Sequence, residues 1–332
     1  MHQRVLCAIV KNRAEQQPPY CSRKAFARIH ISAKLLTEAE LIRMPQIPDL
    51  INLAIPGFIA LLLLEVVLDA VMRRDLYQFK DTAASLAMGT GSLLLGVASK
   101  ALAFAAYTAV HRFAIFNIAY QWWAWGILFF AEDFTYYWFH RTSHECRLFW
   151  ASHVVHHSSQ RYNLGTALRQ TWTGFFMSFI FWLWLPLVGF PPIMVMTMQA
   201  VSLLYQFWVH TELVRRLGTL EWVMNTPSHH RVHHGSNQRY LDRNHAGVLI
   251  IWDRLFGTFE REGEKVIYGL TKNINSYNPL RIAFHEWIDI WNDVRKADTW
   301  RLKLRYVFGR PGWKEENEMA RLAQPPSAVH PI

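Results

Sequence analysis

Apolar residues gather into long runs in the first half of the chain, separated by short polar loops. Leu50–Val71 would be about 33 Å long as a helix, enough to cross the hydrocarbon of a bilayer. Thr82–Val110 is rich in Gly, Ala and Ser, the small residues that let membrane helices approach closely. Ile118–Phe139 carries tryptophans near its start that suit a membrane interface. The pattern therefore predicts three membrane helices in this half of the chain.

A fourth apolar stretch, Thr171–His210, is interrupted near its middle by the proline-rich segment Pro186–Pro192. Because proline and glycine end helices, this stretch is expected to form a helical hairpin that just crosses the membrane. A hairpin returns the chain to the side it left, so the histidine-rich segments before and after it would face the same aqueous side. The predicted fold is all-α: an integral membrane bundle of about four to five spans in two hairpins, with a histidine-rich di-metal cap in the cytosol.

The sequence also predicts how the chain divides. Met44 precedes the first apolar run directly and reads as a natural start, so the basic segment before it is expected to be disordered or an over-extended start. Leu280–Ala297 has the polar and apolar spacing of an amphipathic helix on the cap or the membrane interface. The expected divisions are a leader (1–43), membrane helices (44–131), a histidine-rich domain (132–262), a cap with the amphipathic helix (263–310) and a disordered tail (311–332).

Charge and cysteine content narrow the classes of protein. The formal net charge is +10, yet no nucleic-acid motif is visible, and the basic residues flank the apolar runs. The basic loop Arg73–Asp81 would be cytoplasmic by the positive-inside rule, which also places the histidines on the cytoplasmic side. The three cysteines form no CxxC pair, so neither a disulfide framework nor a thiolate metal site is indicated.

Ten of the sixteen histidines fall between residues 140 and 234. Histidines three or four residues apart share one face of a helix, so several imidazoles can reach one ion. Protonated imidazoles packed so closely would repel one another, and neutral ones in a half-buried place need partners. A bound metal resolves both problems. The spaced sets are His140 with His144, His153 with His156 and His157, and His230 with His233 and His234; His210 ends the second hairpin on the same side.

Eight or nine histidines exceed the four ligands of a zinc site and suit two ions, although imidazole alone does not choose among Zn, Cu, Fe and Ni. The string HECRL at His144 is not HExxH, so a zinc protease is not supported. Asp133 lies on the helical stripe of His140 and His144 and could orient a ligand imidazole, with Glu132 and Glu145 as alternates. Two other classes stay open: a histidine-rich metal transporter or sensor, and a silent scaffold with a structural zinc pair.

The three histidine blocks among membrane helices resemble the fatty acid hydroxylase and sterol desaturase superfamily of integral-membrane di-iron oxygenases. Within it, the chain is most similar to the members that cleave ether lipids. The resemblance covers about Glu132–Phe259. The strings that carry it are YYWFHRTSHE (Tyr136–Glu145), HVVHHSSQRYNLGTALRQ (His153–Gln170), LLYQFWVHTE (Leu203–Glu212), NTPSHHRVHHG (Asn225–Gly235) and NHAGVLIIWDRLFGTFE (Asn244–Glu260).

The resemblance implies two iron ions and an O2-dependent hydroxylation or desaturation of a lipid C–H bond. The substrate would be an alkylglycerol ether, cleaved through a hemiacetal, or else a sterol or fatty acyl chain. Electrons would come from outside, since no Rossmann glycine motif is present; the resemblance suggests tetrahydrobiopterin. Val214 stands where some relatives carry a further histidine, with Asn225, His229 or water as candidates for that place. The implied metal ligands, all but His210 also taken as catalytic, are His140, His144, His153, His156, His157, His210, His230, His233 and His234.

Overall fold

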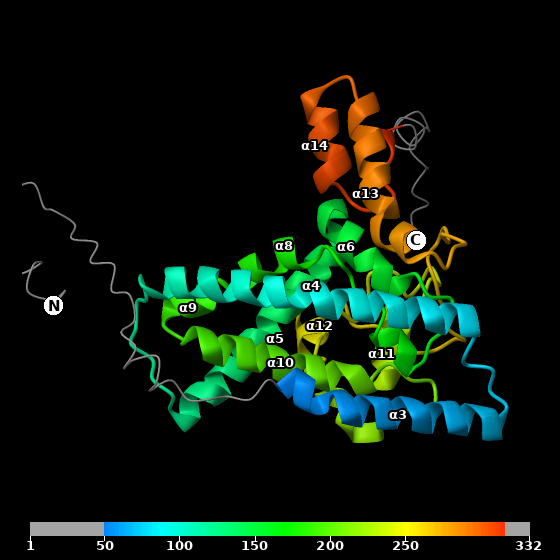
Figure 1. Cartoon of the computed structure of the whole chain (residues 1–332), viewed down its shortest axis with the longest axis horizontal. Helices are drawn as coiled ribbons and strands as arrows, with labels where there is room; N and C mark the ends of the chain where they lie inside the picture. Colours follow the sequence, from blue (N-terminus) through cyan, green and yellow to red (C-terminus); the bar gives the residue numbers. More distant parts are fainter. Residues whose placement is uncertain (1–49, 316–332) are drawn as a thin grey trace, which may run out of the picture. The chain divides into compact units, whose positions relative to one another are not determined.

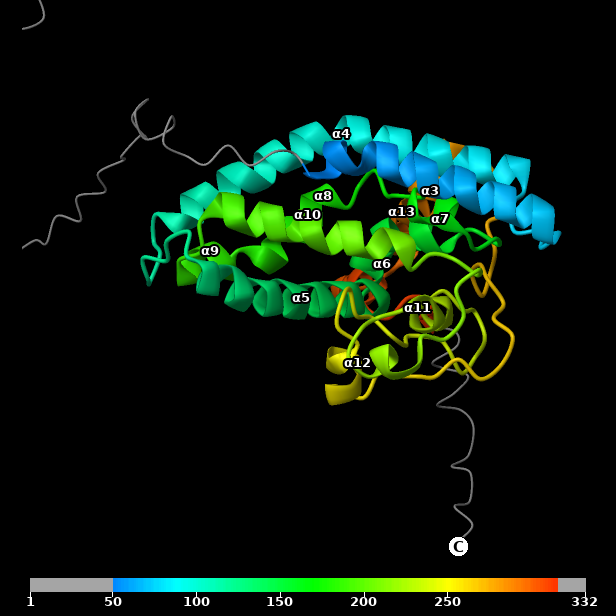
Figure 2. The same ribbon diagram turned by 90° about the horizontal axis from the view of Figure 1, so that it is seen from below.

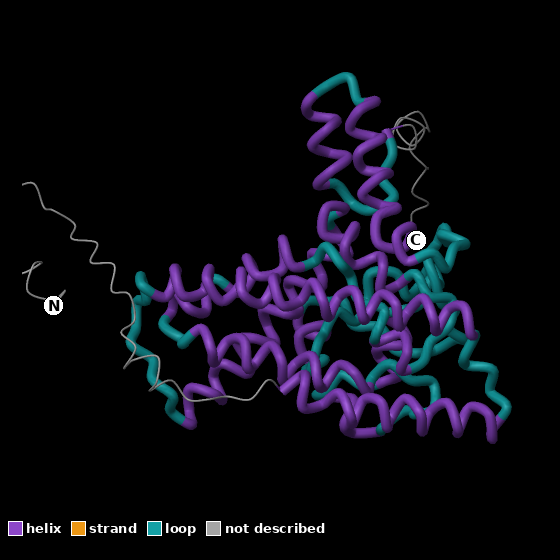
Figure 3. The backbone as a smooth tube through the Cα atoms, viewed as in Figure 1, coloured by secondary structure: helices purple, strands orange, loops and turns teal. Residues whose placement is uncertain are grey.

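The structure, a computed structural model, describes residues 50–315. These residues belong to the second of two compact units, Ile47–Ile332. The expectations for residues 1–43 and for most of the tail lie outside the described residues. Within the described part, every regular element is a helix, and the only extended pairings are isolated bridges between Met224 and Leu249 and between Gly235 and Tyr268. Figure 3 shows this helical content, which confirms the predicted all-α class.

Two of the described helices are long and apolar enough to cross a membrane: α3 (Leu50–Met72) and α4 (Phe79–His111). Only 6% of the most apolar window of either helix is buried, which distinguishes both from the core helices of a soluble protein. Their bounds agree with the first two predicted runs to within three residues. A short polar loop joins them, and α10 (Pro192–Trp208) packs against both. Figures 1 and 2 show α3, α4 and α10 extending in a common direction.

The third and fourth predicted runs are helical but differ from the prediction. α5 (Trp122–Glu145) begins four residues after the predicted start and continues past the predicted end at Phe139. The additional turns carry His140 and His144, which are buried. The first limb of the predicted hairpin is broken into α8 (Phe175–Ser178), η1 (Phe179–Trp182) and α9 (Trp184–Val188), whereas the second limb is the continuous α10. The break falls at Gly189, whose φ of 131° suits glycine alone. By length and hydropathy, two described helices qualify as spans, so four to five spans remain a prediction.

The larger apolar core joins α4, α5, α9 and α10, with Tyr107, Leu128 and Met194 fully buried. Two glycines of α4 let the segment after the first histidines approach this bundle closely. A Cβ on Gly89 would meet the carbonyl oxygen of Leu168 at 2.7 Å, and one on Gly91 would meet the Trp172 ring at 2.4 Å. Close packing of residues 168–172 against α4 therefore depends on the small residues that the sequence pattern singled out.

Shorter helices complete the described chain on the side of the bundle that holds the histidines. α13 confirms the predicted amphipathic helix to within one residue at either end. α13 and α14 form an antiparallel pair that projects from the rest of this unit (Figure 1). The bounds are α6 (Arg147–His157), α7 (Leu164–Ala167), η2 (Gly218–Trp222), α11 (Pro227–His233), α12 (Ile251–Leu255), α13 (Pro279–Lys296) and α14 (Trp300–Phe308).

Candidate metal centre

Four elements bring the predicted histidines together. The last turns of α5 supply two, α6 supplies three, the residue after the C-cap of α10 supplies one, and α11 with its C-cap supplies three. The helical spacing presents each set on one face, as the sequence indicated. All nine residues fall into two groups whose candidate ligand atoms lie within 4.8 Å of one another. The first group is His140, His144, His153, His157 and His233, and the second is His156, His210, His230 and His234.

Within each group the Nε2 atoms converge. In the first group the Nε2 of His153 lies 2.9 Å from that of His140 and 3.1 Å from that of His157. In the second group the Nε2 of His210 lies 3.0 Å from that of His156 and 2.9 Å from that of His230. Two nitrogens about 2.1 Å from one ion, at right angles, stand about 3 Å apart. The spacing therefore suits imidazoles that share a metal ion.

Three of the histidines have their tautomer fixed by the backbone. The Nδ1–H of His140 donates to the carbonyl of His245 at 2.7 Å, that of His233 to the carbonyl of Arg243 at 2.9 Å, and that of His210 to the carbonyl of Gln206 at 2.8 Å. A carbonyl can only accept, so Nδ1 holds the proton and Nε2 offers its lone pair to the group. This is the arrangement that metal-ligating histidines ordinarily show.

The imidazoles are held in their neutral form. Burial, and after it the repulsion between neighbouring imidazolium charges, keeps the pKa of six of them well below 6.5: His153, His156, His157, His230, His233 and His234. Their lone pairs are therefore available to a metal at neutral pH. The Nε2 atoms of His144 and His233 are buried without a hydrogen-bond partner among the described residues, which a metal ion would supply. The donor set thus fits two metal ions.

The predicted orienting role of Asp133 takes a different form. Its carboxylate accepts hydrogen bonds from the backbone N–H groups of Val248 (2.8 Å) and Leu249 (3.0 Å) and from the Trp252 indole (2.9 Å), and no described bond joins it to an imidazole. A carboxylate buried at 0% exposure needs such donors. Asp133 therefore fixes the loop that follows residue 244, and reaches the histidines only through that loop.

Asp253 and His245 belong to the same arrangement, and the sequence reasoning missed both as supporting residues. The Asp253 carboxylate accepts from the backbone N–H groups of His245 and Ala246, each at 2.8 Å, and from the Thr258 hydroxyl at 2.7 Å. The carbonyl of His245 in turn holds His140. The signal available in the sequence was an acid in an apolar string, IIWDRLF, eight residues after His245. Two buried carboxylates thus position the backbone that orients a candidate ligand.

The other tentative residues lie outside the two groups. Glu145 pairs with Arg141 at 3.1 Å, and the Asn225 amide donates to the carbonyls of Ala246 and Gly247. His229 faces Glu221 at 4.0 Å rather than the other imidazoles. The carbonyl of Val214 accepts from Arg231, so this residue takes part in backbone packing. Among these acids, Asp242 comes nearest to the role of orienting a grouped imidazole, because its carboxylate lies 3.6 Å from the Nδ1 of His144.

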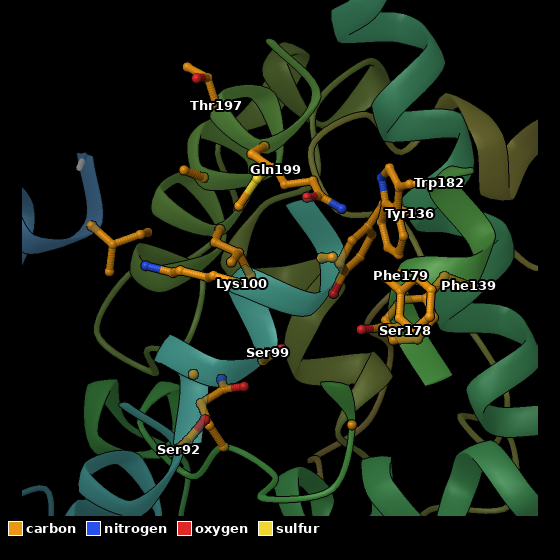
Figure 4. A pocket seen from close by; sticks show the side chains of 18 of the residues that line it. Ser92, Ser99, Lys100, Tyr136, Phe139, Ser178, Phe179, Trp182, Thr197 and Gln199 are labelled. Carbon is orange, nitrogen blue, oxygen red and sulfur yellow. The ribbon is translucent and has the colours of Figure 1, made fainter. Parts of the chain in front are cut away.

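A largely apolar cavity of about 500 Å³ lies among α4, α5, α10 and residues 170–182. Figure 4 shows Tyr136, Phe139 and Trp182 together on one side of this cavity. The ring of Tyr136 is also 5.3 Å from that of His140, so one side chain borders both the cavity and the first histidine group. Glu132, the other acid weighed as an orienting residue, lines the cavity at 1% exposure. The first histidine group therefore lies next to this apolar space, with Tyr136 between them.

Comparison with known proteins gives the class to which this arrangement belongs. Residues 125–258 match the family model described as "Fatty acid hydroxylase", and this segment contains all nine grouped histidines. The chain therefore carries a fatty acid hydroxylase domain, and the resemblance stated from the histidine motifs is confirmed. Together with the two apolar helices, this match supports a membrane protein.

Within that class, the chain is similar to alkylglycerol monooxygenases. It is 42% identical to the enzyme of Homo sapiens over 273 residues, which cover 81% of this chain and 61% of the relative. It is 41% identical to that of Xenopus tropicalis over 80% of this chain and 60% of the relative. An ornithine lipid hydroxylase of Rhizobium tropici is 28% identical over 55% of this chain and 50% of that relative. The chain thus spans about three fifths of the alkylglycerol monooxygenases. No solved structure matches it.

Proposed function

We propose that this chain is an O2-dependent di-iron monooxygenase that hydroxylates a C–H bond of a lipid held within the membrane. One observation carries the proposal: two groups of neutral imidazoles have converging Nε2 atoms, and Tyr136 stands between the first group and an apolar cavity. Nitrogen-only ligand sets accept iron, and an apolar cavity accepts a hydrocarbon chain. The nine grouped histidines are the proposed ligands, five for one ion and four for the other.

The bound iron ions would supply the activation of O2, and the chain's own residues would do the rest. The carbonyls of His245, Arg243 and Gln206 hold the ligand rings in one tautomer, which keeps the donor geometry fixed through the reaction. The cavity walls exclude water and hold the lipid in register, so that one carbon lies beside the ions. Tyr136, between cavity and centre, is the side chain placed to set that register.

The proposed substrate is an alkylglycerol ether, because relatives that are 42% identical to this chain carry the name alkylglycerol monooxygenase. Hydroxylation consumes O2, two electrons and two protons, and it yields the hydroxylated lipid and water. When the hydroxyl enters next to the ether oxygen, the hemiacetal collapses to an aldehyde and a free glycerol hydroxyl. An outside donor supplies the electrons, and tetrahydrobiopterin is the proposed one. A fatty acyl or sterol substrate is the second candidate, and similarity to "Fatty acid hydroxylase vlmA" of Lecanicillium favours the fatty acyl form.

The proposal places the histidines on the cytoplasmic side of a multi-pass protein. Its support is the basic segment where α3 is joined to α4: Arg73 and Arg74 lie in the loop, and Lys80 lies in the first turn of α4. The loop lies at the histidine end of the bundle, because Glu65 and Asp81 on either side of it bond to residues flanking the histidine segments. The Glu65 carboxylate accepts from the Thr211 hydroxyl, and the Asp81 carboxylate pairs with Arg169 at 2.5 Å.

The test supplies 18O2, an alkylglycerol and tetrahydrobiopterin to membranes that contain the chain, and it follows the label by mass spectrometry. We expect 18O in the aldehyde product with the unaltered chain, and none with His157→Ala, a change inside the first group. His285→Ala is the matched control, because His285 on α13 lies outside both groups. If unaltered and His157→Ala membranes oxidise the lipid equally, the proposal is wrong. Label in a hydroxylated fatty acid or sterol would favour the second candidate.

A further inference from the structure

The helical pair α13–α14 carries apolar side chains that no other described element covers. On α13 the residues Leu280, Ile288 and Trp291 recur at the spacing of one helical stripe and are exposed by 62%, 55% and 61%. On α14 the residues Trp300 and Phe308 are exposed by 66% and 56%, with Leu304 between them on the same stripe. On its opposite face α13 buries Ile282, Ala283 and Ile290, whereas no residue of α14 is fully buried. The exposed stripe of α13 is therefore additional to the residues that hold this helix in place.

Basic residues flank these exposed stripes. The exposed charged side chains between residues 279 and 308 are six bases and two acids, because the other two acids, Glu286 and Asp293, are engaged by Arg147. On α14, Arg301 and Lys303 project on either side of the stripe formed by Trp300 and Leu304. The exposed bases are Arg281, Arg295, Lys296, Arg301, Lys303 and Arg305; the exposed acids are Asp289 and Asp298. An apolar stripe with flanking bases is the pattern of a helix that lies on an anionic membrane surface.

The orientation of α13 and α14 relative to α4 also suits a position on the membrane surface. Figures 1 and 2 show α13 and α14 running across the direction of α4 rather than along it. If α4 crosses the bilayer, the pair extends in the plane of the membrane. The contacts of α13 with α4 involve Ala84 and Met88, in the first third of α4, near the end that carries the basic loop. The α13–α14 pair therefore leaves the bundle toward the histidine-bearing side of α4, at the level of a membrane interface.

The exposed stripe of α13 is continuous with the surface of the membrane helices. Phe284 of that stripe packs edge-on against Trp172, with ring centroids 6.4 Å apart, and Trp172 packs on α4 and donates its indole N–H to the carbonyl of Met88. The Trp287 indole donates to the Thr173 hydroxyl at 3.1 Å, which fixes the middle of α13 to the same segment. A membrane surface that contacts α4 would thus continue along the exposed stripe of α13, with no band of polar residues between the two helices.

From these four observations we propose that the α13–α14 pair lies on the membrane surface and binds anionic lipid headgroups. Trp291, Trp300 and Leu304 enter the interface, while Arg301 and Lys303 pair with the headgroups. The proposal is independent of the catalytic one, since it concerns no residue of the two histidine groups. It has one consequence for them: Arg147 joins α13 to the start of α6, the helix that carries His153, His156 and His157. The membrane surface would therefore set the position of α6.

The test uses the full chain in nanodiscs, with an environment-sensitive fluorophore on a single cysteine. Cys7, Cys21 and Cys146 are changed to Ser. The labelled position is then introduced by Leu304→Cys, in the α14 stripe, or by Asp289→Cys, on the face of α13 opposite its stripe. The discs contain phosphatidylcholine alone or with phosphatidylserine, and quenchers are supplied on the acyl chains or in the water. We expect acyl-chain quenching of the label at 304 but not at 289, and stronger quenching with phosphatidylserine.

Charge reversal tests the headgroup contact separately. Arg301→Glu with Lys303→Glu should abolish the increase in acyl-chain quenching that phosphatidylserine causes. Each base that is removed lowers the preference for an anionic surface by about fivefold. The matched control, Lys265→Glu with Lys272→Glu, makes the same charge change on exposed residues outside the pair and should retain the gain. Equal quenching of both labels from the water would overturn the proposal. So would protection of the 304 label from both quenchers, because a protein partner would then cover the stripe.

Discussion

The buried carboxylate of Asp253 gives a sharp test of how the backbone orients the histidines. Asp253→Asn keeps the size of the side chain and removes its charge. With the amide oxygen in the place of Oδ1, the bonds from the His245 N–H and the Thr258 hydroxyl persist as neutral bonds, each weaker by about 1 kcal/mol. The new NH2 group then faces the N–H of Ala246, which loses its acceptor at a cost of about 1–3 kcal/mol.

Burial raises the pKa of the Asp253 carboxyl to about 6, so removal of the charge also relieves a desolvation cost, which offsets the two weaker bonds. The free energy of unfolding should therefore fall by about 1–3 kcal/mol, the cost of the unpaired Ala246 N–H, and the melting temperature of the purified protein by about 5 °C. The shift of the His245 carbonyl should also weaken its bond to His140, so the first histidine group should retain less metal than the second. Thermal unfolding followed by circular dichroism and metal analysis by mass spectrometry measure the two effects. The matched control is Asp289→Asn, which changes an exposed carboxylate of α13.

An Asp253→Asn protein with the melting temperature and metal content of the unaltered chain would refute this reasoning. A protein with a lower melting temperature but an unchanged metal content would show that Asp253 stabilises the fold without orienting His140.

Three further predictions follow from the same geometry. His153→Ala and His156→Ala remove ligands from different groups, so each change should lower the bound metal from two ions to about one. Both changes together should remove nearly all of the metal. Complete loss of metal from either single change would mean one shared site. Gly91→Val should press a side chain against the Trp172 ring at the cavity wall and raise the KM for long-chain lipids more than it lowers kcat; an unchanged KM would exclude this cavity as the lipid site. The metal-free protein should melt earlier as the pH falls from about 7.5 to 5.5, because unfolded imidazoles gain protons below 6.5 whereas the buried ones, with their lowered pKa, do not; a constant melting temperature would contradict the burial argument.

Periodicity was sufficient to predict what depends on local spacing. The two apolar runs became α3 and α4, the 280–297 stripe became α13, and the nine histidines came together because i, i+3 and i+4 positions share a helical face. The predicted first limb of the hairpin was too regular, since Thr171–Gly189 packs as short turns against α4 and α5, where tertiary contacts outweigh the continuous apolar pattern.

The support of the site could not be predicted, because it depends on contacts between distant segments. Asp133 and His140 share one face of α5, as predicted. The Asp133 carboxylate nevertheless accepts from the backbone N–H groups of Val248 and Leu249, more than 100 residues away in sequence. Asp253 acts on the backbone of His245, and its apolar neighbours in the sequence, IIWDRLF, indicate burial but do not indicate which backbone groups it holds. Backbone donors and acceptors become visible only once the chain is folded.

The central claim is that each group of imidazoles holds one redox-active ion at the end of the lipid cavity. Metal analysis of the chain, purified in active form from cells supplied with iron, zinc and copper together, tests it most directly. The account predicts two iron ions per chain, lost in parallel with activity when a chelator is added and regained when iron is restored. Active protein that contains only zinc, or one ion per chain at full activity, would contradict it.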